Sequence, residues 1–332
     1  MLYITTREKY DAYTAARTLA GDRAPDGGWY LPFRMPYFDD EGITALHKST
    51  VSQCVARMLN LFFSTKLTAW DIETCIGRNP VKVRGLGQKL LLSEFWRNLE
   101  GSYDKLETAL ASRIHADGST RITSWLKIAI RISLLFGTYG ELRRQDLLGE
   151  DGVLDIAVPA DDMNLTMAVW YCREMGLPVG NIVCSCSKNS TLWDLLHTGE
   201  CRAENAPKEL ERLIFGTLGI GEVQKFLSAV SEGGVYRLLP VDAEKLRNGI
   251  FAAVVSEDRM SSVINSVHRT NACILEPDTA LAFGGIMDFR AKTGECRATL
   301  LLADHSPADY AATVSEALKI TPSQLNMLLE KA

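Results

Sequence analysis

Two neighbouring aspartates, Asp161 and Asp162, lie between a short apolar run at 153–158 and a stretch of helical periodicity that ends near Met175. A helix N-terminus offers unpaired N–H groups and a partial positive charge, so a glycine-rich loop at this place is suited to hold a phosphate. Here the loop carries carboxylates, and Asp is a preferred helix cap. A phosphate would meet like charges, at a cost of about 1 kcal/mol or more each. We expect Asp161 or Asp162 to cap the helix, and the loop with Asn164 to hold no phosphate.

The elements that position this loop predict an α/β fold. The run at 153–158, the helix to Met175 and a second run at 181–186 have short links, which is typical of a right-handed parallel unit. Apolar spacing predicts further helices at 8–20, 40–63, 121–140, 207–218, 222–230, 308–318 and 322–329. Short apolar runs predict buried strands at 252–255, 272–275 and 298–302. The expected fold is a mainly parallel sheet flanked by helices.

Other candidate motifs are weaker. The glycine cluster at 216–221 follows a predicted helix, whereas a dinucleotide fingerprint follows a strand, so we interpret it as a helix end and a turn. Asp304 and His305 could form a general-base pair, but no matching nucleophile is evident, and a hydrogen-bonded loop histidine is favoured. Cys184 and Cys186 lack a second pair at zinc-ligand spacing, so we interpret them as buried thiols and predict no metal site.

The composition of the chain limits the classes of protein to which it can belong. The chain has 332 residues, is 46% hydrophobic and 23% charged, and has a net charge of −5. This composition predicts a normal buried core, and the interspersed charges favour neither nucleic acid nor a membrane as partner. The longest apolar run, near 128–136, is interrupted by Arg131 and is too short to span a membrane. The eight cysteines have no secreted-scaffold spacing, so we expect a cytoplasmic protein.

Motifs along most of the chain share one order with a known family. The most specific is residues 21–32, Gly-Asp-Arg-Ala-Pro-Asp-Gly-Gly-Trp-Tyr-Leu-Pro. The others are Tyr3-Ile4-Thr5-Thr6-Arg7, Glu100-Gly101-Ser102-Tyr103-Asp104, Ile122-Thr123-Ser124-Trp125-Leu126-Lys127-Ile128, Asn189-Ser190-Thr191-Leu192, Glu276-Pro277-Asp278-Thr279-Ala280 and His305 with Pro307 and Tyr310. Together with the loop at 153–178, they resemble the threonine synthases, pyridoxal-phosphate (PLP) enzymes of fold type II in amino-acid biosynthesis.

The resemblance implies a PLP site that this sequence lacks in several places. The family's cofactor lysine lies in a Phe-Lys-Asp motif followed by a Ser-Gly-Asp-Thr-Gly loop, and neither occurs here. His47-Lys48 resembles that motif only superficially. The family's phosphate-loop glycines are replaced by Asp161 and Asn164, and Ala303 stands where the resemblance implies a threonine beside the pyridine nitrogen. PLP chemistry starts from a lysine Schiff base, so these losses favour a scaffold without catalytic residues or cofactor.

The resemblance implies two regions, a small N-terminal helical region at 1–75 and a truncated α/β PLP-type domain at 76–332 without the lysine-bearing mobile subdomain. We expect an apolar segment to fill the resulting gap, or else a homodimer to cover it. The residues of that segment are Leu86, Leu90, Leu91, Leu92, Phe95 and Trp96.

Two function classes remain from the sequence. The first is a pseudoenzyme that binds a protein partner or a small ligand in the old cleft. The alternative is a PLP-dependent lyase or synthase that acts on phosphohomoserine or a related amino acid through an unrecognised lysine, Lys82 or Lys89.

Overall fold

The centre of the molecule is a six-stranded sheet of order β10-β7-β6-β11-β5-β4. The computed structural model describes residues 1–8, 11–78, 81–98, 101–160, 163–188, 190–202 and 205–331. Neighbouring strands are parallel except β4 and β5. The strands are β4 (Val83–Gly87), β5 (Leu90–Glu94), β6 (Leu154–Pro159), β7 (Val179–Cys186), β10 (Ile250–Val254) and β11 (Thr299–Ala303). The prediction of an α/β fold with a mainly parallel sheet is therefore confirmed.

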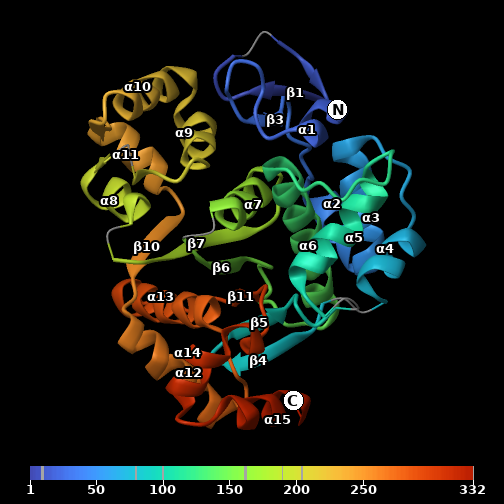
Figure 1. The fold of residues 1–332 in the computed structure, drawn as a ribbon, viewed down its shortest axis with the longest axis vertical. Helices are drawn as coiled ribbons and strands as arrows, with labels where there is room; N and C mark the ends of the chain where they lie inside the picture. Colours follow the sequence, from blue (N-terminus) through green and yellow to red (C-terminus); the bar gives the residue numbers. More distant parts are fainter. Residues whose placement is uncertain are drawn as a thin grey trace.

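Helices cover both faces of this sheet (Figure 1). Along β11, Leu300 and Leu302 join one apolar cluster and Leu301 joins the other, because successive side chains of a strand point to opposite faces. One face packs against helices α6 (Ser124–Arg144) and α7 (Met163–Glu174). The other face packs against α12 (Glu257–Asn271), α13 (Pro277–Thr293) and α14 (Ala311–Leu318), with η3 (Pro307–Tyr310) and α15 (Pro322–Lys331) beside them.

Helix α6 is the longest helix of the described residues and is buried along most of its length. Thr123 caps its first turn by accepting the N–H of Leu126. Two glycines allow the N-terminal region to approach closely: a Cβ at Gly140 would lie 2.8 Å from the carbonyl oxygen of Leu46, and one at Gly137 would lie 2.8 Å from a methyl carbon of Val51. The helix therefore joins the N-terminal region to the sheet through a single apolar core.

The N-terminal region contains a small sheet as well as helices. Strands β1 (Leu2–Thr5), β2 (Tyr13–Thr14) and β3 (Tyr30–Pro32) form an antiparallel sheet of order β2-β1-β3. The helices are α1 (Ala15–Ala20), α2 (Asp40–Thr44), η1 (Ala45–Lys48), α3 (Val51–Phe63) and α4 (Ala69–Ile76). The predicted helix at 8–20 is thus wrong at residues 11–14, because Tyr13 and Thr14 pair with β1 instead. The 1–75 and 76–332 division stays an interpretation.

The described residues between 77 and 120 form a hairpin and one helix. Strands β4 and β5 pair antiparallel, and α5 (Tyr103–Ile114) follows them. The expected apolar segment lies here: five of its side chains are buried and Trp96 packs against the core. Strand β5 joins the sheet beside β11, so the segment is buried as part of the central sheet. No second parallel sheet forms among the described residues of this segment.

A group of short helices follows β7. It comprises α8 (Thr191–Thr198), α9 (Leu210–Leu218), α10 (Ile220–Ser231) and α11 (Pro240–Arg247), with an antiparallel pair β8 (Glu200–Arg202) and β9 (Val235–Arg237). The glycine cluster at 216–221 ends α9 at Gly219, whose positive φ of 86° separates α9 from α10, as predicted. The predicted strand at 272–275 is wrong, because this run links α12 to α13. Short apolar runs do not distinguish strands from buried connections.

Candidate functional site

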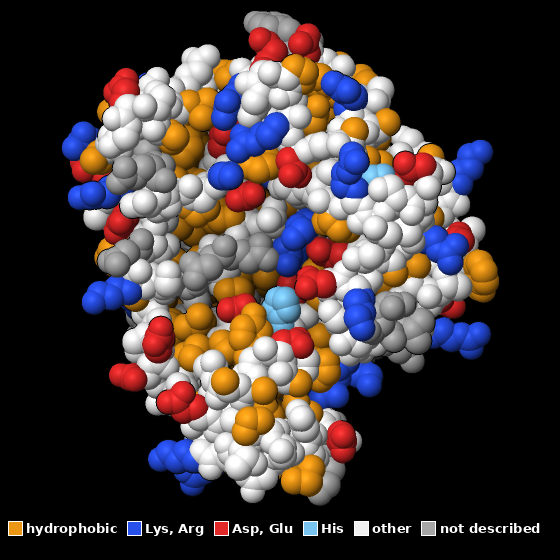
Figure 2. All heavy atoms as spheres, viewed as in Figure 1, with side chains coloured by type: hydrophobic (Ala, Val, Ile, Leu, Met, Phe, Trp, Pro, Cys, Tyr) orange, Lys and Arg blue, Asp and Glu red, His pale blue; other side chains and the backbone are white. Residues whose placement is uncertain are grey.

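The carboxyl ends of five parallel strands meet at one edge of the central sheet, which is where open α/β folds bind ligands. The chain leaves β11 into Asp304 and His305, and it leaves β6 into the loop before α7. Asp161 and Asp162 lie outside the described residues, so their predicted capping role stays a prediction. In the space-filling view, acidic and basic side chains gather beside a histidine in the hollowed middle of one face (Figure 2).

A buried ion pair lies at the carboxyl end of β11. A guanidinium nitrogen of Arg131, on α6, lies 3.0 Å from a carboxylate oxygen of Asp304. Both residues are buried, with 7% and 8% of their surface exposed. The guanidinium also lies 5.2 Å from the ring centre of Tyr103, on α5. The positive charge that interrupts the apolar run of α6 is therefore matched by a carboxylate from the edge of the sheet.

A second carboxyl group, that of Glu107 on α5, adjoins this pair. Burial raises the pKa of Glu107 above its usual value, the positive charge of Arg131 opposes that shift, and the negative charge of Asp304 adds to it. With Glu107 protonated, the group formed by Tyr103, Glu107, Arg131 and Asp304 has no net charge. We call these four residues the edge cluster.

His305 lies beside Tyr310 rather than in a described pair with Asp304. The two rings meet edge to face, with centres 5.8 Å apart. Burial raises the pKa of Tyr310 to about 12, with further contributions from Asp278 and Glu276. The carboxylate of Asp304 is engaged by Arg131, and this geometry favours the interpretation of His305 as a loop histidine.

The N-terminus of α13 holds a buried carboxyl group below the same edge. Glu276 is 2% exposed and accepts hydrogen bonds from the N–H groups of Asp278 and Thr279 and from the Thr279 hydroxyl. Burial nevertheless raises the pKa of Glu276 to about 8, and the charge of Asp278 adds to the shift. The side chain accordingly serves as a helix cap that favours the protonated form.

The buried carboxyl group of Glu276 should make the free energy of unfolding fall as the pH rises. The folded protein keeps the proton of Glu276 between the ordinary pKa of 4.5 and about 8, where the unfolded chain has lost it. The free energy of unfolding should therefore decrease across this interval, and Glu276→Gln should remove that component of the slope while keeping an acceptor at the cap. Urea unfolding at several pH values measures it, with the exposed Glu257→Gln as the control. An unchanged slope in Glu276→Gln would contradict the assignment.

Asn164, in the first turn of α7, is bound to neighbouring helices. The Ser124 hydroxyl donates to the Asn164 side-chain oxygen at 3.0 Å, and the guanidinium of Arg212 donates to the Ser124 hydroxyl at 2.6 Å. Arg212, on α9, is fully buried and also donates to the Tyr30 carbonyl. The start of α7 is thereby connected to α6, α9 and the N-terminal sheet.

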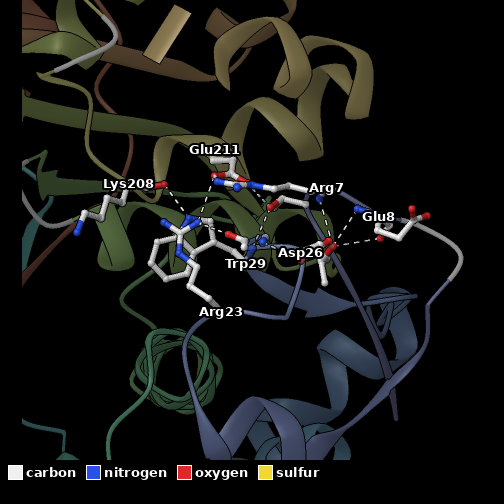
Figure 3. Close-up of polar contacts among 11 residues, drawn as sticks. Arg7, Glu8, Arg23, Asp26, Trp29, Lys208 and Glu211 are labelled. Atoms are coloured by element: carbon white, nitrogen blue, oxygen red, sulfur yellow. Dashed lines mark hydrogen bonds and ion pairs between the residues drawn. The ribbon is translucent and has the colours of Figure 1, made fainter. Parts of the chain in front are cut away.

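The 21–32 motif forms a second polar network, between the N-terminal sheet and α9 (Figure 3). The carboxylate of Glu211 is 3% exposed and accepts two hydrogen bonds of 3.1 Å from Arg7, as well as a longer one of 3.4 Å from Arg23. The Arg23 guanidinium lies 3.5 Å from the ring centre of Trp29, which donates to the Lys208 carbonyl. Asp26 holds the turn by accepting the N–H of Gly28. The motif thus serves the packing of α9 against the N-terminal sheet.

The remaining candidates from the sequence behave as packing residues. Cys184 and Cys186 are buried thiols on β7 outside any disulfide, and burial holds the pKa of Cys184 well above its usual range. Within the described ranges, no three His, Cys, Asp or Glu residues come close enough to hold a metal ion. In the same ranges no helix is long and apolar enough to cross a bilayer.

Three comparisons with known proteins agree on the relationship. Residues 2–79 match the model of the threonine synthase N terminus. Threonine synthase-like 1 of Macaca fascicularis is 23% identical over 221 residues, and that of Homo sapiens is 22% identical over the same length. These findings support membership of the threonine synthase family. The matched region covers 61% of this chain but only 29% of those relatives, so the chain spans less than a third of their length.

Solved threonine synthases share the fold of this chain. The PLP-bound enzyme from Brucella melitensis superimposes with a TM-score of 0.80 at 16% identity, covering 99% of this chain and 94% of that chain. The yeast enzyme gives the same TM-score and coverage at 13% identity. At these identities the likeness establishes the architecture, and the site must be judged from its own residues.

The residues on which this edge depends most have only weak signals in the sequence. Arg131 is visible there only as an interruption of an apolar run, and neither Glu107 nor Arg212 belongs to any of the motifs. One signal was present: an arginine inside an otherwise apolar helix needs a buried partner, because an unpaired buried charge is costly. The partner itself could not be found, since Asp304 lies 173 residues further along the chain.

Proposed function

We propose that this threonine-synthase-like chain has lost PLP binding and catalysis and acts as a binding or interaction scaffold. The observation that supports the proposal most strongly is the edge cluster. At the end of β11, Arg131 and Asp304 neutralise each other, and burial favours the protonated form of Glu107. A site that stabilises a charged cofactor needs groups directed at the ligand, whereas these groups are directed at one another.

The residues at this edge do not fit PLP. When bound, PLP supplies an electron sink on a lysine Schiff base, and it needs an anion site and a polar partner for its ring nitrogen. The sequence has no Phe-Lys-Asp motif and places Asp161 and Asp162 before α7. Asn164 is already bonded to Ser124, and Ala303 is an apolar residue with 4% exposure at the end of β11. The chain therefore lacks three features that PLP requires: the cofactor lysine motif, the phosphate site and the polar residue beside the ring nitrogen.

The alternative function is an enzyme that uses a different lysine for the Schiff base. Of the two candidate lysines, Lys82 and Lys89, only one lies at the carboxyl edge of the sheet. Lys89 precedes β5, at the amino edge of the sheet, where its carbonyl accepts the N–H of Thr299. Lys82 precedes the antiparallel strand β4, and its carbonyl accepts the N–H of Glu94 at the carboxyl end of β5. A PLP-dependent lyase or synthase acting on phosphohomoserine would therefore rely on Lys82.

A PLP titration separates the two functions. We expect no visible absorbance of an internal aldimine when the purified chain is incubated with PLP, because Asp161 and Asn164 replace the glycines of the family's phosphate loop and the sequence lacks the Phe-Lys-Asp motif. Borohydride treatment and peptide mass analysis should then find no pyridoxyl-lysine. A reduced adduct on Lys82 that disappears in Lys82→Ala but persists in Lys89→Ala would overturn the scaffold proposal in favour of the enzyme.

A further inference from the structure

A basic pocket lies where the β4–β5 hairpin meets the N-terminus of α3 and the C-terminus of α6. Its volume is about 750 Å³, within the size range of small-molecule sites. Much of its lining comes from Arg78 and from residues between 81 and 97, a part of the chain that carries no Phe-Lys-Asp motif. Five basic side chains line it: Arg78, Lys82, Arg84, Arg97 and Arg144.

The charge of this pocket is opposite to that of the whole chain. Two acidic side chains, Glu94 and Glu141, line it beside the five basic ones, which leaves three more positive than negative charges. The chain as a whole has a net charge of −5. The N-terminus of α3 and the C-terminus of α6 both reach the pocket, so their helix dipoles offset each other and the side chains set the sign.

The two acidic residues hold arginines in place inside the pocket. Glu94 is 4% exposed; Arg97 donates to one of its oxygens at 3.0 Å and Arg84 lies 3.8 Å from the other. Across the pocket, Glu141 binds Arg144, whose guanidinium also donates to the Ser49 carbonyl. Fixed guanidinium groups lose less side-chain entropy when a ligand binds, which favours recognition.

Two further basic side chains at the pocket are exposed and can move to contact a bound ligand. Lys82 is exposed at the mouth of the pocket, and the Arg78 side chain is 91% exposed, 3.8 Å from Glu73. Held arginines beside mobile cations suit a small ligand with two or more closely spaced anionic groups, because guanidinium forks match both phosphate and carboxylate. We infer that this pocket binds a small multivalent anion, a phosphorylated or polycarboxylate metabolite. The inference gives a ligand class to the scaffold role proposed above and rests on it.

Titration calorimetry with inorganic pyrophosphate and, separately, with citrate at constant ionic strength tests the site. We expect a dissociation constant of about 1 mM or tighter for at least one of them. Lys82→Glu should weaken binding about tenfold or more, because it reverses a charge at the pocket mouth. Lys89→Glu is the matched control, with the same charge change on the same hairpin. It lies about five strand residues away, roughly 16 Å and beyond the screening length, and should leave affinity unchanged.

The anion that binds identifies the ligand class: pyrophosphate favours a phosphate ester and citrate a polycarboxylate. Arg78→Glu is a second variant at an exposed position, should Lys82→Glu fail to fold. The inference is overturned if neither anion binds, or if binding is equally strong in the pocket variants and in Lys89→Glu. A pyridoxyl adduct on a lysine would overturn the scaffold proposal alone, so the two failures are distinguishable.

Discussion

Arg131→Met should lower the free energy of unfolding by about 3–5 kcal/mol, the usual cost of removing one partner of a buried ion pair. Arg131 is 7% exposed and carries the positive charge that the buried carboxyl groups of Asp304 and Glu107 face. Methionine has a similar length and packs well in apolar surroundings, so the loss measures charge rather than volume. Urea unfolding followed by circular dichroism gives the value.

The pH dependence of this loss distinguishes the ion pair from packing. Burial raises the pKa of Glu107, and removing Arg131 takes away the positive charge that opposes this shift. A carboxyl group with a raised pKa binds its proton more tightly in the folded state, so its destabilising effect grows as the pH rises. The penalty of Arg131→Met should therefore shrink at acidic pH, where Glu107 can take up its proton.

Two further variants complete this test. Asp304→Asn combined with Arg131→Met should lose less stability than the sum of the single changes, since the double variant leaves no uncompensated charge at the former pair. Arg143→Met is the control, because Arg143 is exposed on the same helix and should change stability by about 0.5 kcal/mol or less. Additive losses in the double variant would mean that Arg131 and Asp304 do not stabilise each other.

The sequence predicted the architecture where local patterns were sufficient. The unit β6-α7-β7 follows from apolar runs and short links, and β11 from an apolar run near the C-terminus. The small sheet of the N-terminal region escaped prediction because β2 has only two residues and depends on pairing with β1. Local propensity cannot predict so short an element, which tertiary pairing alone stabilises.

The candidate site was predictable only in part. The loop before α7 and the residues after β11 follow from the rule that ligands bind at the carboxyl ends of parallel strands. The edge cluster depends on contacts between α5, α6 and the end of β11, and the basic pocket on contacts between α3, α6 and the β4–β5 hairpin. Such long-range contacts leave no periodic signal in a single sequence.

Glu211→Gln should be the second strongly destabilising change, with a loss of about 3 kcal/mol in the free energy of unfolding. Its carboxylate is 3% exposed and accepts hydrogen bonds from Arg7 and Arg23, as well as from the Thr6 hydroxyl. Glutamine keeps the shape but leaves the two guanidinium groups without their counter-charge. The value lies at the low end for a broken buried pair, because both arginine side chains are about one-third exposed and can reach water.

The effect of Glu211→Gln should extend beyond the direct contacts of its carboxylate. Arg23 and Arg212 both lie near the ring of Trp29, at 3.5 Å and 4.6 Å from its centre, and Arg212 continues the polar contacts to Ser124. Loosening α9 should therefore also expose Trp29, which a red shift of its fluorescence would report. Glu209→Gln, two residues away and only half-buried, is the matched control. Equal losses of unfolding free energy in the two variants would mean that the buried carboxylate of Glu211 does not stabilise the packing of α9 against the N-terminal sheet.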